Sequence, residues 1–301
     1  MALRIIRESD PIEVAQLSVC IYSVPGIGKT STGFTADDPF LLDFDKGAYR
    51  SRNRRDCGRP ESWEDVCDIE ADVRPFKAVI VDTAGRALDL LTADIIKQEP
   101  KLGRGGALTL QGYGVLRNKF VAWLKQVKSF GKDPIMLVHS DEQKKGDETV
   151  ERLDVQGGSK NEIYKSADVM GRLFTRDGER YLNFNPTDTN FGKNPVQLPE
   201  LKVPDFELEP NWLGGVIRDI KAKLNAQTAS QMAAAAFLEG WRTKLDAITD
   251  PLDFTLAIED LKATECSEAQ RGVVKRLIND KAVAKGFAFD RASKSFVAKA
   301  A

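Results

Sequence analysis

Residues 23–30 read SVPGIGKT, a stretch that fits the phosphate-binding loop pattern G-x-x-x-x-G-K-[ST] at every fixed position except the first. In such a loop, backbone N–H groups of a tight turn at a helix N-terminus surround phosphate oxygens. Gly28, Lys29 and Thr30 fit the end of the pattern, whereas Ser23 replaces the first glycine. That glycine mainly serves the turn, so a serine with negative φ can replace it at modest strain. The stretch therefore predicts an intact nucleotide site.

The parts of the loop have separate expected roles. The Lys29 ammonium would neutralise charge on the β- and γ-phosphates of ATP, and the Thr30 hydroxyl would bind Mg²⁺. The context favours this interpretation over a chance Gly-Lys-Thr turn, because a strand pattern over 17–23 precedes the loop and a helical pattern over 28–34 follows it. The residues expected to bind the nucleotide are Ser23, Val24, Pro25, Gly26, Ile27, Gly28, Lys29, Thr30 and Ser31.

Several other short apolar runs read as buried strands. Helical patterns at 86–98 and 113–129 separate some of them, which is typical of parallel strands joined by crossover helices. The sequence thus predicts an α/β core with a mostly parallel sheet. A hairpin is expected over 168–184, where RDGE supplies an Asp-Gly turn. The expected strands are 3–7, 17–23, 40–44, 76–81 and 134–138.

A polar side chain stands at the end of three of these runs. Asp82 follows AVIV and is expected to hold Mg²⁺ through water, although it could instead cap the next helix. Asp45 follows FLLDF and could orient the attacking water, or merely serve a turn. His139 follows PIMLV and could sense the γ-phosphate, or be an ordinary hydrogen-bonded residue at a strand end. Lys29, Asp45, Asp82 and His139 are the candidate catalytic residues.

The composition is that of an ordinary soluble globular chain. It has 301 residues, 42% of them hydrophobic and 30% charged, with a formal net charge of −1. No overall field therefore favours nucleic acid or membranes, and any DNA contact must come from local patches. Four scattered cysteines and one histidine argue against a zinc site and for free thiols in a reducing compartment. No apolar run approaches the ~18 residues of a membrane helix, so we expect a cytoplasmic protein that contacts no membrane.

With the strand ends in this order, the chain resembles the RecA-like ATPases, and within them the phage-encoded nucleotide-binding proteins that include RecA-like single-strand annealing proteins. The resemblance covers roughly residues 15–192. It implies a RecA-like P-loop core, ATP and Mg²⁺ as cofactors, and ATP between the subunits of an oligomer or filament. The matching segments are VPGIGKTS, LLDFDKG, AVIVDTAG, LTLQGYGVLRNKF, IMLVHSDEQ and DVQGGSKNEIYKSADVMGRLF.

The resemblance also implies a function and marks two departures. The implied function is ATP-dependent binding of single-stranded DNA, with annealing or pairing of strands in phage homologous recombination, in the host cytoplasm. The family places a catalytic glutamate after the second strand, where Asp45 is one methylene shorter. Recombinases often carry a glutamine near the position of His139.

Three segments are candidates for DNA binding. The loops 97–112 and 141–160 are glycine-rich and carry a few cations, which suits a phosphate backbone. The arginine-rich segment 50–59 could contact DNA, or reach the nucleotide of a neighbouring subunit in a filament. Solvated surface loops are the alternative for each. The candidate residues are Arg50, Arg52, Arg54, Arg55, Lys101, Arg104, Lys144, Lys145, Arg152, Gly157, Gly158 and Lys160.

The chain is expected to divide near residue 205. The core would occupy 1–205, and a helical C-terminal domain would occupy 206–301 with a possible hairpin over 287–301. The Pro-rich stretch 186–210 reads as a linker or a surface strap. The C-terminal domain could contact a recombination or replication protein. Two other functions stay open: an ATPase that loads or remodels such a partner, and a nucleotide-dependent assembly protein with little turnover.

Overall fold

The computed structural model describes residues 13–145, 148–155, 159–290 and 293–298. The strand expected at 3–7 lies outside them. The chain divides into two compact units, one formed by Val14–Leu224 and the other containing the chain from Asn225 onward. The division falls inside the long helix α6 (Trp212–Asp246), later than the expected boundary at 205.

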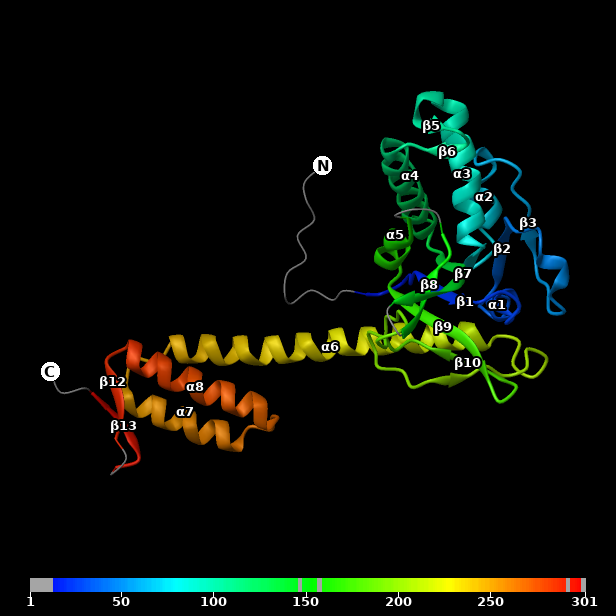
Figure 1. Ribbon diagram of the computed structural model, residues 1–301. Coiled ribbons are helices and arrows are strands. Elements are labelled where there is room, and N and C mark those ends of the chain that lie inside the picture. Colours follow the sequence, from blue (N-terminus) through cyan, green and yellow to red (C-terminus); the bar gives the residue numbers. More distant parts are fainter. Residues whose placement is uncertain (1–12, 146–147, 156–158, 291–292, 299–301) are drawn as a thin grey trace. The chain divides into compact units, whose positions relative to one another are not determined.

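The first unit is built on a nine-stranded, mostly parallel sheet flanked by helices (Figure 1), as the sequence predicts. The strand order is β11-β10-β9-β1-β7-β4-β2-β3, and β8 pairs with β7. Strands β1 and β4 are buried at every residue, which explains their continuous apolar runs. The parallel strands are β1 (Val19–Ser23), β2 (Pro39–Asp43), β3 (Cys57–Gly58), β4 (Ala78–Asp82), β7 (Asp133–Lys145) and β9 (Val169–Arg176). The antiparallel strands are β8 (Glu148–Leu153), β10 (Glu179–Asn183) and β11 (Leu201–Lys202).

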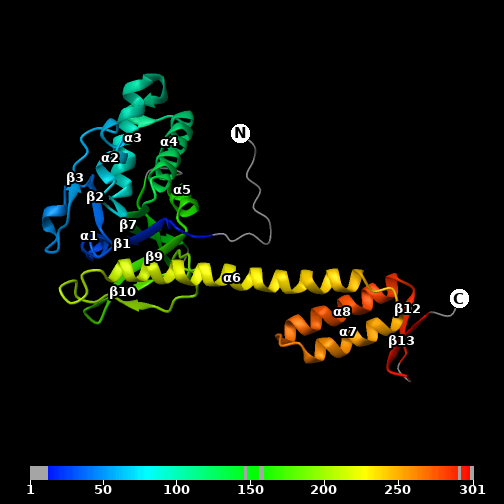
Figure 2. The same ribbon diagram turned by 180° about the vertical axis from the view of Figure 1, so that it is seen from behind.

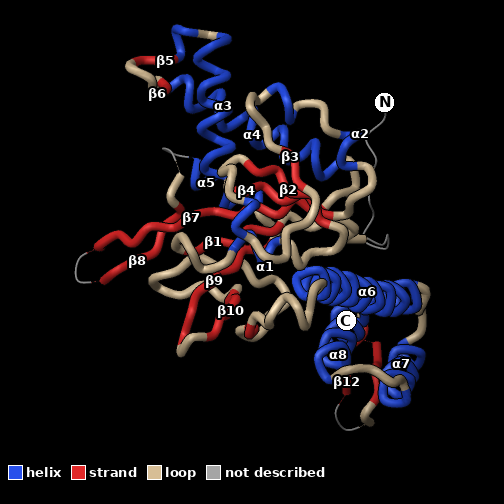
Figure 3. The backbone as a smooth tube through the Cα atoms, turned by 90° about the vertical axis from the view of Figure 1, so that its right-hand side faces the viewer, coloured by secondary structure: helices blue, strands red, loops and turns tan. Residues whose placement is uncertain are grey.

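Alternate side chains of the sheet face two separate apolar clusters. Tyr22 belongs to the cluster covered by α3 (Ala84–Gln98) and α4 (Leu110–Ser129). Ile21 belongs to the cluster that contains Phe34 after α1 (Lys29–Gly33) and the first turns of α6. Figure 3 shows these helices on opposite sides of the sheet. The smaller elements are η1 (Ala48–Arg50), η2 (Glu64–Val66), α2 (Glu70–Val73), η3 (Pro100–Leu102), β5 (Gly103–Arg104), β6 (Ala107–Leu108) and α5 (Ser159–Ser166).

The strand expected at 134–138 is longer than predicted. β7 continues to Lys145 and forms a hairpin with β8, from the pair Ser140–Leu153 to the pair Lys145–Glu148. The candidate loop 141–160 is therefore not a simple loop. The sequence does not reveal this part of β7, because it extends beyond the buried sheet and its residues are polar. A strand that is not buried needs no apolar run.

The candidate loop 97–112 is also more ordered than predicted. Helix α3 reaches Gln98, and η3 and the small β5–β6 hairpin connect it to α4. The Pro-rich stretch 186–210 packs on the core, where Val196, Leu198 and Val203 are buried. It is a strap and not a linker.

The hairpin predicted at 168–184 is confirmed as β9 and β10. Asp177 and Gly178 have φ of 54° and 80°. A two-residue turn of this type requires positive φ at both positions, which Asp-Gly allows.

The second unit contains α7 (Pro251–Ala263), α8 (Glu268–Ala284) and the hairpin β12 (Phe287–Asp290) with β13 (Ser295–Ala298). Figure 2 shows the hairpin beside the two helices. The predicted C-terminal helices are confirmed. Phe254 and Phe296 are fully buried in the apolar cluster of this unit. Among the described helices, none combines the length and the apolar character that crossing a membrane would demand.

Candidate nucleotide-binding site

The candidate residues meet at one edge of the sheet, where the carboxyl ends of the parallel strands lie. Ser23 ends β1 and is level with His139 on β7. Asp82 ends β4 and is level with Asp43 on β2. β7 lies between the strand of the phosphate loop and the strand of Asp82, so His139 stands between those two strand ends.

The loop has the backbone that the sequence predicts. Gly26 and Gly28 have φ of 85° and 99°, a conformation that glycine adopts without strain. Gly28 caps α1, and the Nη1 atom of Arg180 would lie only 2.8 Å from a Cβ placed there. A side chain at this position would therefore be strained by the positive φ, and the end of the Arg180 side chain would have to move aside. Ser23 is an extended strand residue, which explains why glycine is not needed there.

Lys29, the first residue of α1, is buried at this edge of the sheet. Its Nζ lies 3.0 Å from both the carbonyl oxygen and the Oγ of Ser23, 3.2 Å from the Val24 carbonyl oxygen and 3.1 Å from His139 Nδ1. Burial lowers the pKa of Lys29 to about 8, and the carboxylates of Asp82 and Asp45 partly oppose that shift. A desolvated cation with only neutral direct partners is poised to donate to phosphate oxygens.

Thr30 and Asp82 form the second half of the site. The Thr30 hydroxyl donates to Asp82 Oδ2 at 2.7 Å, and Asp82 is only 3% exposed. Burial raises the pKa of Asp82 to about 6, against the lowering effect of the Thr30 hydrogen bond. A hydroxyl and a carboxylate side by side are suitable ligands for Mg²⁺. The described residues hold no cluster of three or more His, Cys, Asp or Glu side chains that could enclose a metal alone. The pair thus fits Mg²⁺ that shares its other ligands with phosphate and water.

These residues line a cleft of about 730 Å³. Asp45 lies at its side, and its backbone N–H donates to the Asp82 carbonyl at 3.0 Å. Its Oδ1 lies 3.4 Å from Arg86 Nε, so a cation holds the carboxylate. Burial, and then the charge of Lys29, lowers the pKa of His139, which favours the neutral form of its ring. The lining residues are Pro25, Gly26, Gly28, Lys29, Thr30, Ser31, Asp45, Gly47, Arg50, Ser51, Asp82, Arg86, His139 and Asp154.

Sequence reasoning missed Arg86 and Asp154 as lining residues. Arg86 lies in the first turn of α3, four residues after Asp82, which is a signal that could have been used. Asp154 follows β8, and its backbone N–H donates to the His139 carbonyl at 2.8 Å. Only the hairpin brings it to the cleft, so its position along the chain carries no such signal.

Asp43 has a different role from Asp45. Its carboxylate is fully buried and accepts from the backbone N–H groups of Gly47, at 2.8 Å, and Ala48. Arg59 pairs with it at 3.4 Å. Asp43 therefore fixes the turn that carries Asp45.

The arginine-rich segment divides between two environments. Arg50 lines the nucleotide cleft and stacks over Tyr49 at 5.4 Å from the ring centroid. Arg52 pairs with Glu207 at 3.0 Å, whereas Arg54 and Arg55 are exposed. The segment is thus not one continuous DNA-facing patch.

The other candidate DNA residues fall on two separate hairpins. Lys101 and Arg104 are exposed next to β5, at the far end of α3 (Figure 1), about 22 Å from the sheet by the length of that helix. Lys144 is exposed on β7, and the guanidinium of Arg152 lies 4.6 Å from the centroid of the Phe191 ring. The structure does not bring the two segments together. Lys145 lies in β7 and Lys160 in α5, and Gly157 and Gly158 lie outside the described residues.

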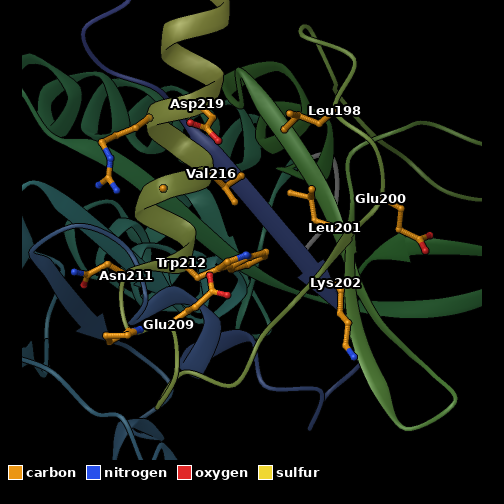
Figure 4. Close-up of a pocket in the computed structure, with 12 residues that line it drawn as sticks. Leu198, Glu200, Leu201, Lys202, Glu209, Asn211, Trp212, Val216 and Asp219 are labelled. Atoms are coloured by element: carbon orange, nitrogen blue, oxygen red, sulfur yellow. The ribbon is translucent and has the colours of Figure 1, made fainter.

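A second hollow, of about 630 Å³, lies between β11 and the first turns of α6 (Figure 4). Leu201, Trp212 and Val216 provide its apolar lining, and Lys202 at its rim pairs with Glu179 at 2.9 Å. No described residue of the phosphate loop lines this hollow. It is separate from the nucleotide cleft.

Comparison with known proteins places this geometry in a family. A family model described as an AAA domain matches residues 15–196, which is more than half of the chain. No curated protein matches the chain. The matched range contains every strand from β1 to β10 and all of the cleft residues. The chain belongs to the AAA domain family, a family of P-loop nucleoside triphosphatases.

Proposed function

We propose that the protein is a Mg²⁺-dependent ATPase that binds single-stranded DNA in its ATP-bound state and promotes annealing or pairing of strands in phage homologous recombination. The observation that carries the ATPase part is the contact between the Thr30 hydroxyl and Asp82 beside the buried Lys29 ammonium. In this proposal the core is RecA-like. ATP lies between subunits of an oligomer or filament in the host cytoplasm.

The proposed chemistry is charge neutralisation and positioning, as in other phosphoryl transfers. Thr30 and Asp82 would hold Mg²⁺, which neutralises charge on the phosphate oxygens. The Lys29 ammonium exchanges its contacts with Ser23, Val24 and His139 for phosphate oxygens. Asp45, held by Arg86, orients the attacking water. Because Nδ1 accepts from Lys29, the neutral ring of His139 carries its proton on Nε2, which could donate to the γ-phosphate.

The β7–β8 hairpin supports the DNA-binding part of the proposal. It continues directly from the strand of His139, so a change at the nucleotide has a short route to Lys144 and Arg152. Cations on an exposed ribbon suit a phosphate backbone, and such binding weakens as salt rises. Binding of ATP and DNA would then be coupled in both directions.

The second unit supports a protein contact. Leu252 and Leu256 are 63% and 58% exposed, and they lie one turn apart on α7. An apolar pair of this kind suits a partner surface. In our proposal the partner is a recombination or replication protein.

The test is binding of a fluorescent ATP analogue and of a labelled single-stranded oligonucleotide by wild type and Lys29→Ala. We expect the variant to lose nucleotide binding, and the wild type to bind DNA more tightly with a non-hydrolysable ATP analogue. Equal nucleotide affinity in both proteins would refute the site. DNA binding that ignores ATP would refute the coupling and favour an ATPase that acts through a protein partner.

A further inference from the structure

Glu151 on β8 is a buried carboxylate outside the set of described residues that line the nucleotide cleft. It is only 6% exposed. Its Oε1 accepts from the Ser140 hydroxyl at 2.5 Å, and its Oε2 accepts from the Arg172 guanidinium. A carboxylate that pays the desolvation cost of burial needs such charged and hydrogen-bonding partners, and removing one of them is expensive.

The contacts of Glu151 join three strands around Lys29. Ser140 is the residue after His139 on β7, and it is buried. Arg172 lies on β9, level with Tyr22 on β1. Tyr22 precedes Ser23, whose two oxygens accept from Lys29. Glu151 is thus the one side chain of this group that contacts both β7 and β9, on either side of the phosphate-loop strand.

The backbone of β8 adds two fixed points. The Glu151 N–H donates to the Thr189 carbonyl at 3.0 Å, and the Asp154 N–H donates to the His139 carbonyl at 2.8 Å. The strand that carries Glu151 therefore also holds the backbone of His139. Without the Glu151 carboxylate, the bond from Ser140 to a charged acceptor and the charge pair with Arg172 are both lost.

We propose that Glu151 is a positioning residue for the nucleotide site: it holds the middle of β7 so that His139 faces Lys29 and the γ-phosphate. The inference rests on the proposed ATPase function for its kinetic consequence, but not for its structural one. The hydrogen bonds of the Glu151 carboxylate go to Ser140 and Arg172, and its charge is the smallest of the three carboxylate effects that raise the pKa of Lys29, after Asp82 and Asp45. Its loss therefore affects the alignment of His139 more than the affinity of the phosphate loop.

The test uses Glu151→Gln, which keeps the shape of the side chain and removes its charge. Glu142→Gln is the matched control, because Glu142 is exposed on the same hairpin and is the cross-strand neighbour of Glu151. We expect kcat for ATP to fall about tenfold or more in Glu151→Gln, since small misplacements of catalytic groups are costly. We expect its KM to change by less than about threefold. Ser140→Ala, which breaks only the bond to β7, should give a smaller fall and remains informative if Glu151→Gln fails to fold.

His139 is the only histidine in the chain, so its ring is a unique probe for NMR after histidine-specific ¹³C labelling. We expect the ring signal of the nucleotide-free protein to move or broaden in Glu151→Gln and to match wild type in Glu142→Gln. Adding a Mg²⁺–ATP analogue should shift the wild-type signal as Lys29 leaves Nδ1, and this shift should shrink in Glu151→Gln.

Wild-type signals and wild-type kcat in both Glu151→Gln and Ser140→Ala would overturn the inference. If the wild-type protein bound no nucleotide, the proposed function would fail, and the nucleotide-free spectra would still decide the positioning role. A raised KM with an unchanged His139 signal would assign Glu151 to nucleotide binding. This result would also overturn the inference.

Discussion

The burial of two charges of opposite sign, Lys29 and Asp82, at the nucleotide site is costly for the fold. Burial lowers the pKa of Lys29 and raises that of Asp82. Both shifts mean that burial disfavours the charged form, which is the form that binds phosphate or Mg²⁺. Bound nucleotide and Mg²⁺ relieve this cost, so ligand binding and folding stability are linked at these residues.

Asp82→Asn tests this cost directly. The folded pKa of Asp82, about 6, lies above its ordinary value, so the folded state binds the proton more tightly. The penalty is absent below the ordinary value, grows as pH rises towards 6, and is complete at higher pH. We therefore expect Asp82→Asn to raise the free energy of unfolding by about 1–3 kcal/mol at pH 8 without ligands, and to abolish Mg²⁺-dependent turnover.

Thermal and urea unfolding between pH 4 and pH 8 would check this expectation. Asp188→Asn, at an exposed loop position, is the control and should leave stability nearly unchanged at every pH. A less stable Asp82→Asn protein at pH 8 would contradict the account of the site.

At the scale of elements, the buried parallel strands could be predicted because burial on both faces demands continuous apolar runs. The polar residues that follow these strands, such as Asp82 and His139, could be predicted because each stands where an apolar run stops. The β7–β8 hairpin could not, because its outer residues face solvent and follow no apolar pattern. Glu151 was missed with it, since its partners Ser140 and Arg172 lie 11 and 21 residues away. Arg50 was assigned to DNA because its charge could be read from the sequence but its direction could not.

The hairpin gives a prediction of its own. Replacing residues 144–149 with Asn-Gly would join Gln143 to Val150 through a favoured two-residue turn and keep Ser140 and Glu151 in place. The replacement removes Lys144 and Lys145 together with Asp147 and Glu148, so the net charge does not change. We expect affinity for single-stranded DNA to fall about tenfold at low salt, since two phosphate contacts are lost, while ATP affinity is retained.

Fluorescence anisotropy with a labelled oligonucleotide measures this effect. Arg104→Ala, on the distant β5–β6 hairpin, serves as the comparison and should bind DNA as wild type does. If Arg104→Ala were the weaker binder, the DNA surface would lie at the far end of α3 and the hairpin assignment would be wrong.

At the scale of the whole molecule, α6 belongs to the core at its beginning and to the second unit at its end. Its first turns bury Leu213, Ile217 and Ile220 against the sheet. Burying each such side chain contributes about 1.5–3 kcal/mol, so together they rival the net stability of a domain.

Two truncations follow from this packing. A chain that ends at Leu224 should fold and bind ATP. A chain that ends at residue 205 should not fold stably and should show no cooperative unfolding transition. Circular dichroism during heating, with and without Mg²⁺–ATP, would distinguish them. Equal melting temperatures for both would show that α6 adds nothing to the core.

The most direct measurement of the central claim is ATP turnover with and without single-stranded DNA, in wild type and in Lys29→Ala. We expect DNA to stimulate turnover in the wild type, and we expect turnover to disappear in the variant. Turnover that survives in Lys29→Ala would contradict the nucleotide site. Wild-type turnover indifferent to DNA would contradict the proposed coupling and would direct the search to a protein partner.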